Sequence, residues 1–226
     1  MRIDINGVKR HELLVRTISV SVLLLLSVLT GCRGGDNPAV TDVSPGVEHP
    51  DTAGFRVIER VPYDPPEEAY PFDLIDQNGE RLTLEDLRGS VLMVTFIYTH
   101  CPEACPLVAA NFRNVQYELE EEVAGKDLVQ VLITTDPDRD SPERLLRYTR
   151  ALNADWYFLT EELDVLREVW DGFDVYWEIK DRSREVVVFH SYKTYLIDRE
   201  GNMRYLFVGV WYPEDIIPDI KNLIEE

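Results

Sequence analysis

Apolar and polar positions alternate from residue 55 onward with spacings that predict an α/β fold. An unbroken apolar run at residues 91–98 (VLMVTFIY) is typical of a fully buried strand. Apolar residues at helical spacing then predict a helix at residues 103–122. A second apolar run at residues 128–135 predicts another buried strand. Strands that alternate with helices are typical of a sheet covered by helices.

Residues 72–89 predict a hairpin around Asn78-Gly79, followed by a helical turn. The remaining expected elements are helices at 161–171 and 213–225, and strands at 55–61, 175–178, 186–189, 194–198 and 204–208. This order of strands and helices is that of a thioredoxin-like fold, in which helices flank a central mixed sheet.

Proline and capping residues set the expected ends of two helices. Asp140 or Ser141 is expected to cap a helix that has Pro142 near its first position, and Glu143 is spaced to complete a capping box. The last helix is expected to start at Pro213. Its interior is expected to be interrupted by Pro218, because proline removes a helical hydrogen bond.

The N-terminus reads as a lipoprotein signal peptide at residues 1–31. Basic residues precede an apolar stretch at 17–30 that is shorter than the roughly 20 residues needed to span a bilayer. The stretch ends Leu29-Thr30-Gly31-Cys32, which resembles a bacterial lipobox, so Cys32 is the predicted site of lipid attachment. The alternative is an uncleaved membrane anchor in which Cys32 has no role. In both cases we expect an exported protein, held at the membrane and facing the periplasm or the cell exterior.

Residues 32–54 are rich in Gly, Pro and Asp and show no periodicity, which predicts a flexible linker. A single domain at 55–226 fills the rest. The net charge of −19 argues against nucleic acid or anionic lipid as a direct partner.

The most informative residues are Cys101 and Cys105, which follow the buried strand at 91–98 where the next helix should begin. At positions i and i+4 of a first turn, the two side chains would share one face, and the helix N-terminus would favour their thiolates. Working sites of open α/β sheets lie at this end of the strands. A merely structural disulfide is disfavoured, because so short a loop removes little unfolded-chain entropy. Disulfide exchange and binding of a thiophilic metal both remain open.

Histidine supplies one further candidate. His11 falls in the signal peptide and His49 in the linker, and His100 is expected to point away from Cys101. His190 precedes the strand at 194–198, in a loop that packs against the active-site helix of thioredoxin-like folds. It is therefore a possible third ligand, and its alternative role is that of a satisfied core or turn residue.

Three stretches, FIYTHCPEACP, TTDPDRDSPERL and HSYKTYLIDREG, occur in this order and resemble the Sco/SenC family of copper-binding proteins. The resemblance extends from Phe72 to the C-terminus. It implies a thioredoxin-like fold and copper held by Cys101, Cys105 and His190. It also implies assembly of the copper A centre of cytochrome c oxidase, whose copper A subunit would be the partner.

One position departs from the family pattern. The residue before the ligand histidine is commonly Asp in the family, and here it is Phe189. The group that orients the imidazole is therefore not identified by the resemblance. Asp136 is a candidate, and its alternative role is to form the turn before Pro137.

Two thiolates and an imidazole suit Cu(I) and tolerate Cu(II), whereas zinc usually takes a fourth ligand. The same cysteines could form a disulfide when oxidised, which would exclude the metal. The leading hypothesis is a copper chaperone, and not an enzyme with turnover. The alternative is a thiol–disulfide oxidoreductase that reduces the acceptor's copper-ligand cysteines. A thiol peroxidase is disfavoured, because the pattern P-x-x-x-T-x-x-C is absent.

Overall fold

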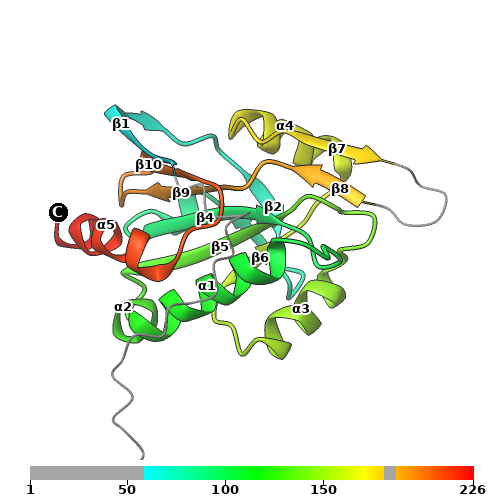
Figure 1. Cartoon of the computed structure of the whole chain (residues 1–226), viewed down its shortest axis with the longest axis horizontal. Helices are drawn as coiled ribbons and strands as arrows, with labels where there is room; N and C mark the ends of the chain where they lie inside the picture. Colours follow the sequence, from blue (N-terminus) through cyan, green and yellow to red (C-terminus); the bar gives the residue numbers. More distant parts are fainter. Residues whose placement is uncertain (1–58, 181–186) are drawn as a thin grey trace, which may run out of the picture. The chain divides into compact units, whose positions relative to one another are not determined.

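Strands β4 and β5 are parallel neighbours in a six-stranded mixed sheet in the computed structural model, which describes residues 59–180 and 187–226 (Figure 1). The strand order is β1-β10-β9-β4-β5-β6. β6 is parallel to β5, whereas β9 is antiparallel to β4 and β10 to β9. The strands are β1 (Glu59–Glu68), β4 (Val91–Ile97), β5 (Leu128–Thr134), β6 (Tyr157–Leu159), β9 (Lys193–Ile197) and β10 (Asn202–Val208).

Helices cover both faces of the sheet, as Figure 1 shows. Side chains alternate between the two faces of β4, so Met93 packs in one apolar layer and Phe96 in the other. The layer with Met93 includes α1, α3 and α5, and the layer with Phe96 includes α4. The helices are α1 (Cys105–Glu118), α2 (Glu120–Ala124), α3 (Pro142–Ala151), α4 (Leu163–Gly172) and α5 (Pro213–Glu225). Among the described residues, no helix combines the length and apolar character that a membrane span requires.

Two small antiparallel pairs complete the fold. β2 (Asp73–Ile75) and β3 (Arg81–Thr83) form the hairpin predicted around Asn78-Gly79, and η1 (Glu85–Leu87) is the helical turn expected after it. Gly79 has φ +85°, a conformation that L side chains rarely adopt. β7 (Trp177–Lys180) pairs with β8 (Val187–His190).

The predicted central mixed sheet with flanking helices is confirmed, as are the two buried strands predicted at 91–98 and 128–135. The predicted signal peptide (1–31), the linker (32–54) and the first residues of the strand expected at 55–61 lie outside the described residues.

The helix predicted at 103–122 is wrong at both ends. It begins two residues later, at Cys105, because Pro106 has no N–H to donate to the carbonyl of residue 102, as a helix starting at 103 would require, whereas proline is tolerated in the first turn of a helix that starts at Cys105. It ends at Glu118, because Leu119 leaves the helical conformation and buries its side chain, and the short α2 follows.

Four further expectations need correction. β6 was not predicted, because a three-residue apolar run carries little periodicity. β1 continues past residue 61 through Pro62 and Pro65, which an edge strand tolerates. Ser141 is the N-cap of α3, but its hydroxyl donates to Glu143 at 2.8 Å, so the expected capping box does not form. Pro218 lies inside α5 without ending it.

Candidate thiol and metal-binding site

Cys101 and Cys105 lie at the carboxyl end of β4, in and just after the loop that leads into α1. Both are free thiols and both are buried, with exposed fractions of 9% and 1%. Only Cys105 belongs to the helix, as its first residue. The expectation that both sulfurs share a first helical turn is therefore wrong for Cys101, which precedes the helix.

His190 meets the start of α1 from β8, a strand far along the chain. Its Nε2 lies 3.6 Å from the Sγ of Cys105, and its side chain is buried. Its Nδ1 lies 3.1 Å from the carbonyl oxygen of Ser191. Because a carbonyl only accepts, Nδ1 carries the proton and Nε2 presents its lone pair toward Cys105. The structure thus brings His190 and Cys105 together.

The backbone carbonyl of Ser191, and not Asp136, orients the imidazole. The carbonyl of Asp136 accepts from the amides of Arg139 and Asp140, and its carboxylate pairs with Arg139. Asp136 therefore has the alternative role of turn formation. No sequence pattern marks Ser191, because any residue offers a carbonyl.

His100 takes a different direction from His190. Its Nδ1 lies 3.2 Å from the Oγ1 of Thr99 and 3.8 Å from a carboxylate oxygen of Asp140, and its side chain is 39% exposed. It therefore faces the start of α3, as expected for a residue that points away from the cysteine pair.

Two tyrosines that were not predicted enclose the imidazole. The ring of Tyr98 meets that of His190 edge to face at 5.8 Å between centroids, and the ring of Tyr192 does so at 5.0 Å. Burial raises the pKa of both phenols, so both stay neutral. The two rings restrict the rotation of the imidazole and keep its surroundings apolar.

The two thiols differ in charge state. A hydrogen bond from Cys105 lowers the pKa of Cys101 to about 6, in spite of burial. The same bond, followed by burial, raises the pKa of Cys105. The expectation that the helix start favours both thiolates is therefore wrong for Cys105, because one proton serves both sulfurs. Burial lowers the pKa of His190 to about 4, which keeps the imidazole neutral and able to act as a ligand.

Across residues 59–180 and 187–226, no three His, Cys, Asp or Glu side chains are already gathered in a metal-binding arrangement. The Sγ of Cys105 lies 3.6 Å from the Nε2 of His190, and Cys101 and Cys105 shift each other's pKa.

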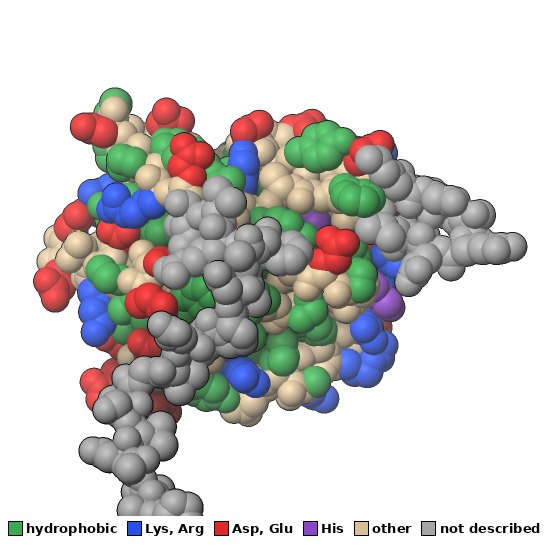
Figure 2. Space-filling model, viewed as in Figure 1, with side chains coloured by type: hydrophobic (Ala, Val, Ile, Leu, Met, Phe, Trp, Pro, Cys, Tyr) green, Lys and Arg blue, Asp and Glu red, His purple; other side chains and the backbone are tan. Residues whose placement is uncertain are grey.

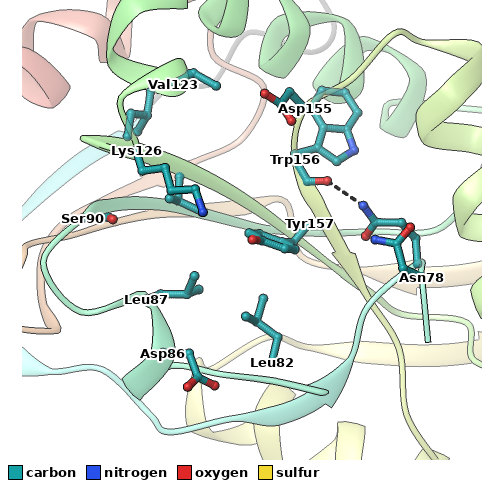
Figure 3. A pocket seen from close by; sticks show the side chains of 13 residues that line it. Asn78, Leu82, Asp86, Leu87, Ser90, Val123, Lys126, Asp155, Trp156 and Tyr157 are labelled. Atoms are coloured by element: carbon teal, nitrogen blue, oxygen red, sulfur yellow. Dashed lines mark hydrogen bonds between the residues drawn. The ribbon is translucent and has the colours of Figure 1, made fainter. Parts of the chain in front are cut away.

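A separate hollow of about 290 Å³ lies at the opposite end of the sheet, beside the first residues of β5 and β6. Figure 3 shows Lys126 extending into it toward Tyr157, with Leu82 and Leu87 on the other side. None of the predicted site residues lines this hollow. The chemistry predicted from the sequence therefore does not belong to it.

At neutral pH we expect iodoacetamide to alkylate Cys101 at least about tenfold faster than Cys105, because the thiolate is the nucleophile. The rate at Cys101 should fall as the pH drops through about 6, where its thiolate is lost. Peptide mass spectrometry measures both rates on the reduced protein. Equal rates at the two cysteines, or a Cys101 rate without that pH dependence, would contradict the assignment.

The chain matches known proteins in sequence and in fold. The family model described as SCO1/SenC matches residues 61–225. The SCO2-like protein of Rickettsia prowazekii is 33% identical over 144 residues, which are 62% of this chain and 69% of that protein.

Two solved structures support the same grouping. Copper-bound ScoI of Bradyrhizobium japonicum is 27% identical, with a TM-score of 0.63 over 69% of this chain and 99% of that one. BsSco is described as a member of the Sco family of cytochrome c oxidase assembly proteins with a disulfide switch. It is 26% identical, with a TM-score of 0.59 over 74% of this chain and 97% of that one. The predicted thioredoxin-like fold is thereby confirmed. Since the family model matches most of its length, the chain belongs to the SCO1/SenC family.

Proposed function

We propose that this protein binds one copper ion through Cys101, Cys105 and His190 and delivers it to the copper A centre of a terminal cytochrome c oxidase. The observation that carries the proposal is the 3.6 Å contact between the Sγ of Cys105 and the Nε2 of a buried, neutral His190. The copper bound to the related ScoI and the role of the Sco family in oxidase assembly support it.

The donor set fits copper for a chemical reason. Cys101 is the more acidic thiol, with a pKa of about 6, and supplies a thiolate before copper arrives. Cys105 loses its proton when it binds, so binding releases a proton. Two soft sulfurs and one imidazole nitrogen favour Cu(I) and still accommodate Cu(II).

Release to an acceptor is also favoured by the way the ligands are distributed. The sulfurs lie at the start of α1, whereas the imidazole belongs to β8, in a separate two-stranded sheet. A small displacement of β8 would remove one ligand and leave two sulfurs, which an acceptor's cysteines could replace stepwise.

The second candidate function, thiol–disulfide exchange, is favoured by the difference between the two thiols. Cys101 has the lowered pKa of an attacking thiol, and the buried Cys105 is placed to resolve a mixed disulfide. The disulfide switch described for BsSco supports this reading. In this role the protein would reduce the acceptor's copper-ligand cysteines before copper insertion.

We also propose that the protein is exported, cleaved after residue 31 and anchored through lipid on Cys32, with residues 32–54 as a flexible tether. The lipobox-like end of the short apolar segment supports this location. A tether of that composition would let the copper site reach a membrane-bound acceptor from the periplasm or the cell exterior.

For copper binding, we expect the reduced protein that begins after Cys32 to bind one copper per chain. Cys101→Ser or Cys105→Ser should abolish tight binding, because that chain has no third cysteine to replace the lost sulfur. His190→Ala should weaken Cu(II) binding by at least about tenfold and change its spectrum. Titration monitored by absorption and electron spin resonance measures both.

The matched control for His190→Ala is His49→Ala, in the predicted linker, which should keep the wild-type affinity and spectrum. Disulfide formation between Cys101 and Cys105 should survive in His190→Ala, because it needs only the sulfurs. Stoichiometric, high-affinity copper in either serine variant would refute the ligand assignment, as would a wild-type spectrum in His190→Ala.

For the cellular role, loss of the protein should lower cytochrome oxidase activity, and added copper should partly restore it. A delivery protein raises the effective copper concentration at its acceptor, so excess copper can substitute for it. A reductase supplies electrons, so an added thiol would substitute instead. Oxidase assays on the deletion strain distinguish the two, and rescue by thiol alone, with His190→Ala fully active, would favour the oxidoreductase.

For the location, the mature protein should start at Cys32, carry lipid there and sediment with membranes. Cys32→Ala should lose the lipid and should not be processed at this position. Mass spectrometry of the purified protein measures the mass and the first residue. A mature chain that retains residues 1–31 would favour the uncleaved anchor.

A further inference from the structure

Asp140 lies next to the start of a helix, but its carboxylate does not cap that helix. Its side chain is fully buried, directly before the N-cap of α3. No side-chain hydrogen bond caps that helix. A buried carboxylate needs donors, and those of Asp140 come from other elements.

The donors gather at the carboxyl ends of β4 and β5, which lie next to one another in the sheet (Figure 1). The Oδ2 of Asp140 accepts from the backbone N–H of Thr99 at 3.0 Å and from the hydroxyl of Thr134 at 2.7 Å. Its Oδ1 accepts from the hydroxyl of Thr99 at 2.5 Å. The carboxylate of Asp140 thus links the end of β5 and the start of α3 to Thr99, which lies two residues before Cys101.

Thr99 is held from a further side. The Nε of Arg144, on α3, donates to its Oγ1 at 2.9 Å. That oxygen therefore accepts from a guanidinium while its own proton goes to Asp140, which fixes both the rotamer and the backbone of Thr99. Two residues later, the N–H of Cys101 donates to the carbonyl of Tyr98 at 3.3 Å.

Cys101 itself belongs to neither a strand nor a helix. Its position therefore depends on where the chain leaves β4, and Thr99 is the point at which that exit is held. Among the described residues, the side-chain hydrogen bonds of Asp140 go to Thr99 and Thr134. Asp140 is thus not one of the donors in the proposed ligand set.

From this geometry we infer that Asp140 is a positioning residue, which acts through Thr99 to hold Cys101 where its sulfur can meet Cys105 and copper. The inference rests on the proposed function for the copper part only, because placement of the thiol is a property of the chain itself. It concerns a residue that the sequence pattern marks merely as a helix cap.

The test uses the full chain in detergent with Cys32→Ser in every variant, so that alkylation reports only the two site cysteines. We expect Asp140→Asn to lower copper affinity by about tenfold, to change the Cu(II) spectrum and to change the ratio of Cys101 to Cys105 alkylation. Thr99→Val should do the same, and Thr99→Ser, which keeps the hydroxyl, should behave as wild type.

A double-mutant cycle distinguishes positioning from general destabilisation. If Asp140 acts through Thr99, Asp140→Asn combined with Thr99→Val should be no worse than either variant alone. The matched control is Asp198→Asn, because Asp198 is also a buried carboxylate that accepts backbone N–H bonds, but in the turn between β9 and β10. It should lower the denaturation midpoint and leave affinity, spectrum and alkylation ratio unchanged.

Wild-type affinity and alkylation ratio in Asp140→Asn would overturn the inference, as would fully multiplicative effects in the double variant. If Asp140→Asn does not fold, the Thr99 pair decides, and a wild-type Thr99→Val overturns the inference. If the wild type binds no copper but the alkylation ratio responds as expected, the positioning role stands and the copper assignment fails.

Discussion

Cys105 and His190 are 85 positions apart in the sequence, and the fold has to bring their side chains to 3.6 Å in a buried environment. The central position of β4 makes this possible. α1 is the next element of the chain after β4, and β9, which pairs with β4, begins three residues after His190. Both ends of the contact are therefore attached to one buried strand. The seclusion of the site keeps the imidazole neutral and allows the two thiols to share one proton.

The alternation of side chains along β8 explains why Phe189 can stand where the family commonly has Asp. Successive side chains of a strand point to opposite faces, so Phe189 and His190 point in opposite directions. The structure agrees, since His190 is buried and Phe189 is 42% exposed. Figure 2 shows hydrophobic side chains at the surface in the region of β7 and β8. A side chain at position 189 is therefore badly placed to orient the imidazole, and the carbonyl of Ser191 does so instead.

The unequal thiols are compatible with both proposed functions. A pair with one thiolate and one thiol is ready for nucleophilic attack, and the same pair becomes a dithiolate once a cation offsets the second charge. Redox exchange needs the sulfurs alone, whereas copper capture needs the imidazole too. His190 is thus the residue whose substitution would distinguish the two proposed functions.

The local pattern of the sequence was sufficient for elements whose cause is local. The unbroken apolar run of β4, the Asn78-Gly79 turn and the proline at the start of α5 determine their own conformations, and all were predictable. The two cysteines and His190 were recognisable as candidates, because their residue types are suited to copper and their stretches resemble one family. The start of α1 was missed by only two residues, since Pro106 lacks the N–H that an earlier start would need.

Only the tertiary structure decided the contacts between residues that are distant in the sequence. The direction of Asp140 toward Thr99, and not toward its own helix, depends on β4 and β5 ending side by side. The enclosure of His190 by Tyr98 and Tyr192 depends in the same way on where strands end. The sequence therefore determined which groups are present. The packing of the sheet determined which of them meet and which share a proton, because burial and distance are set by the whole fold.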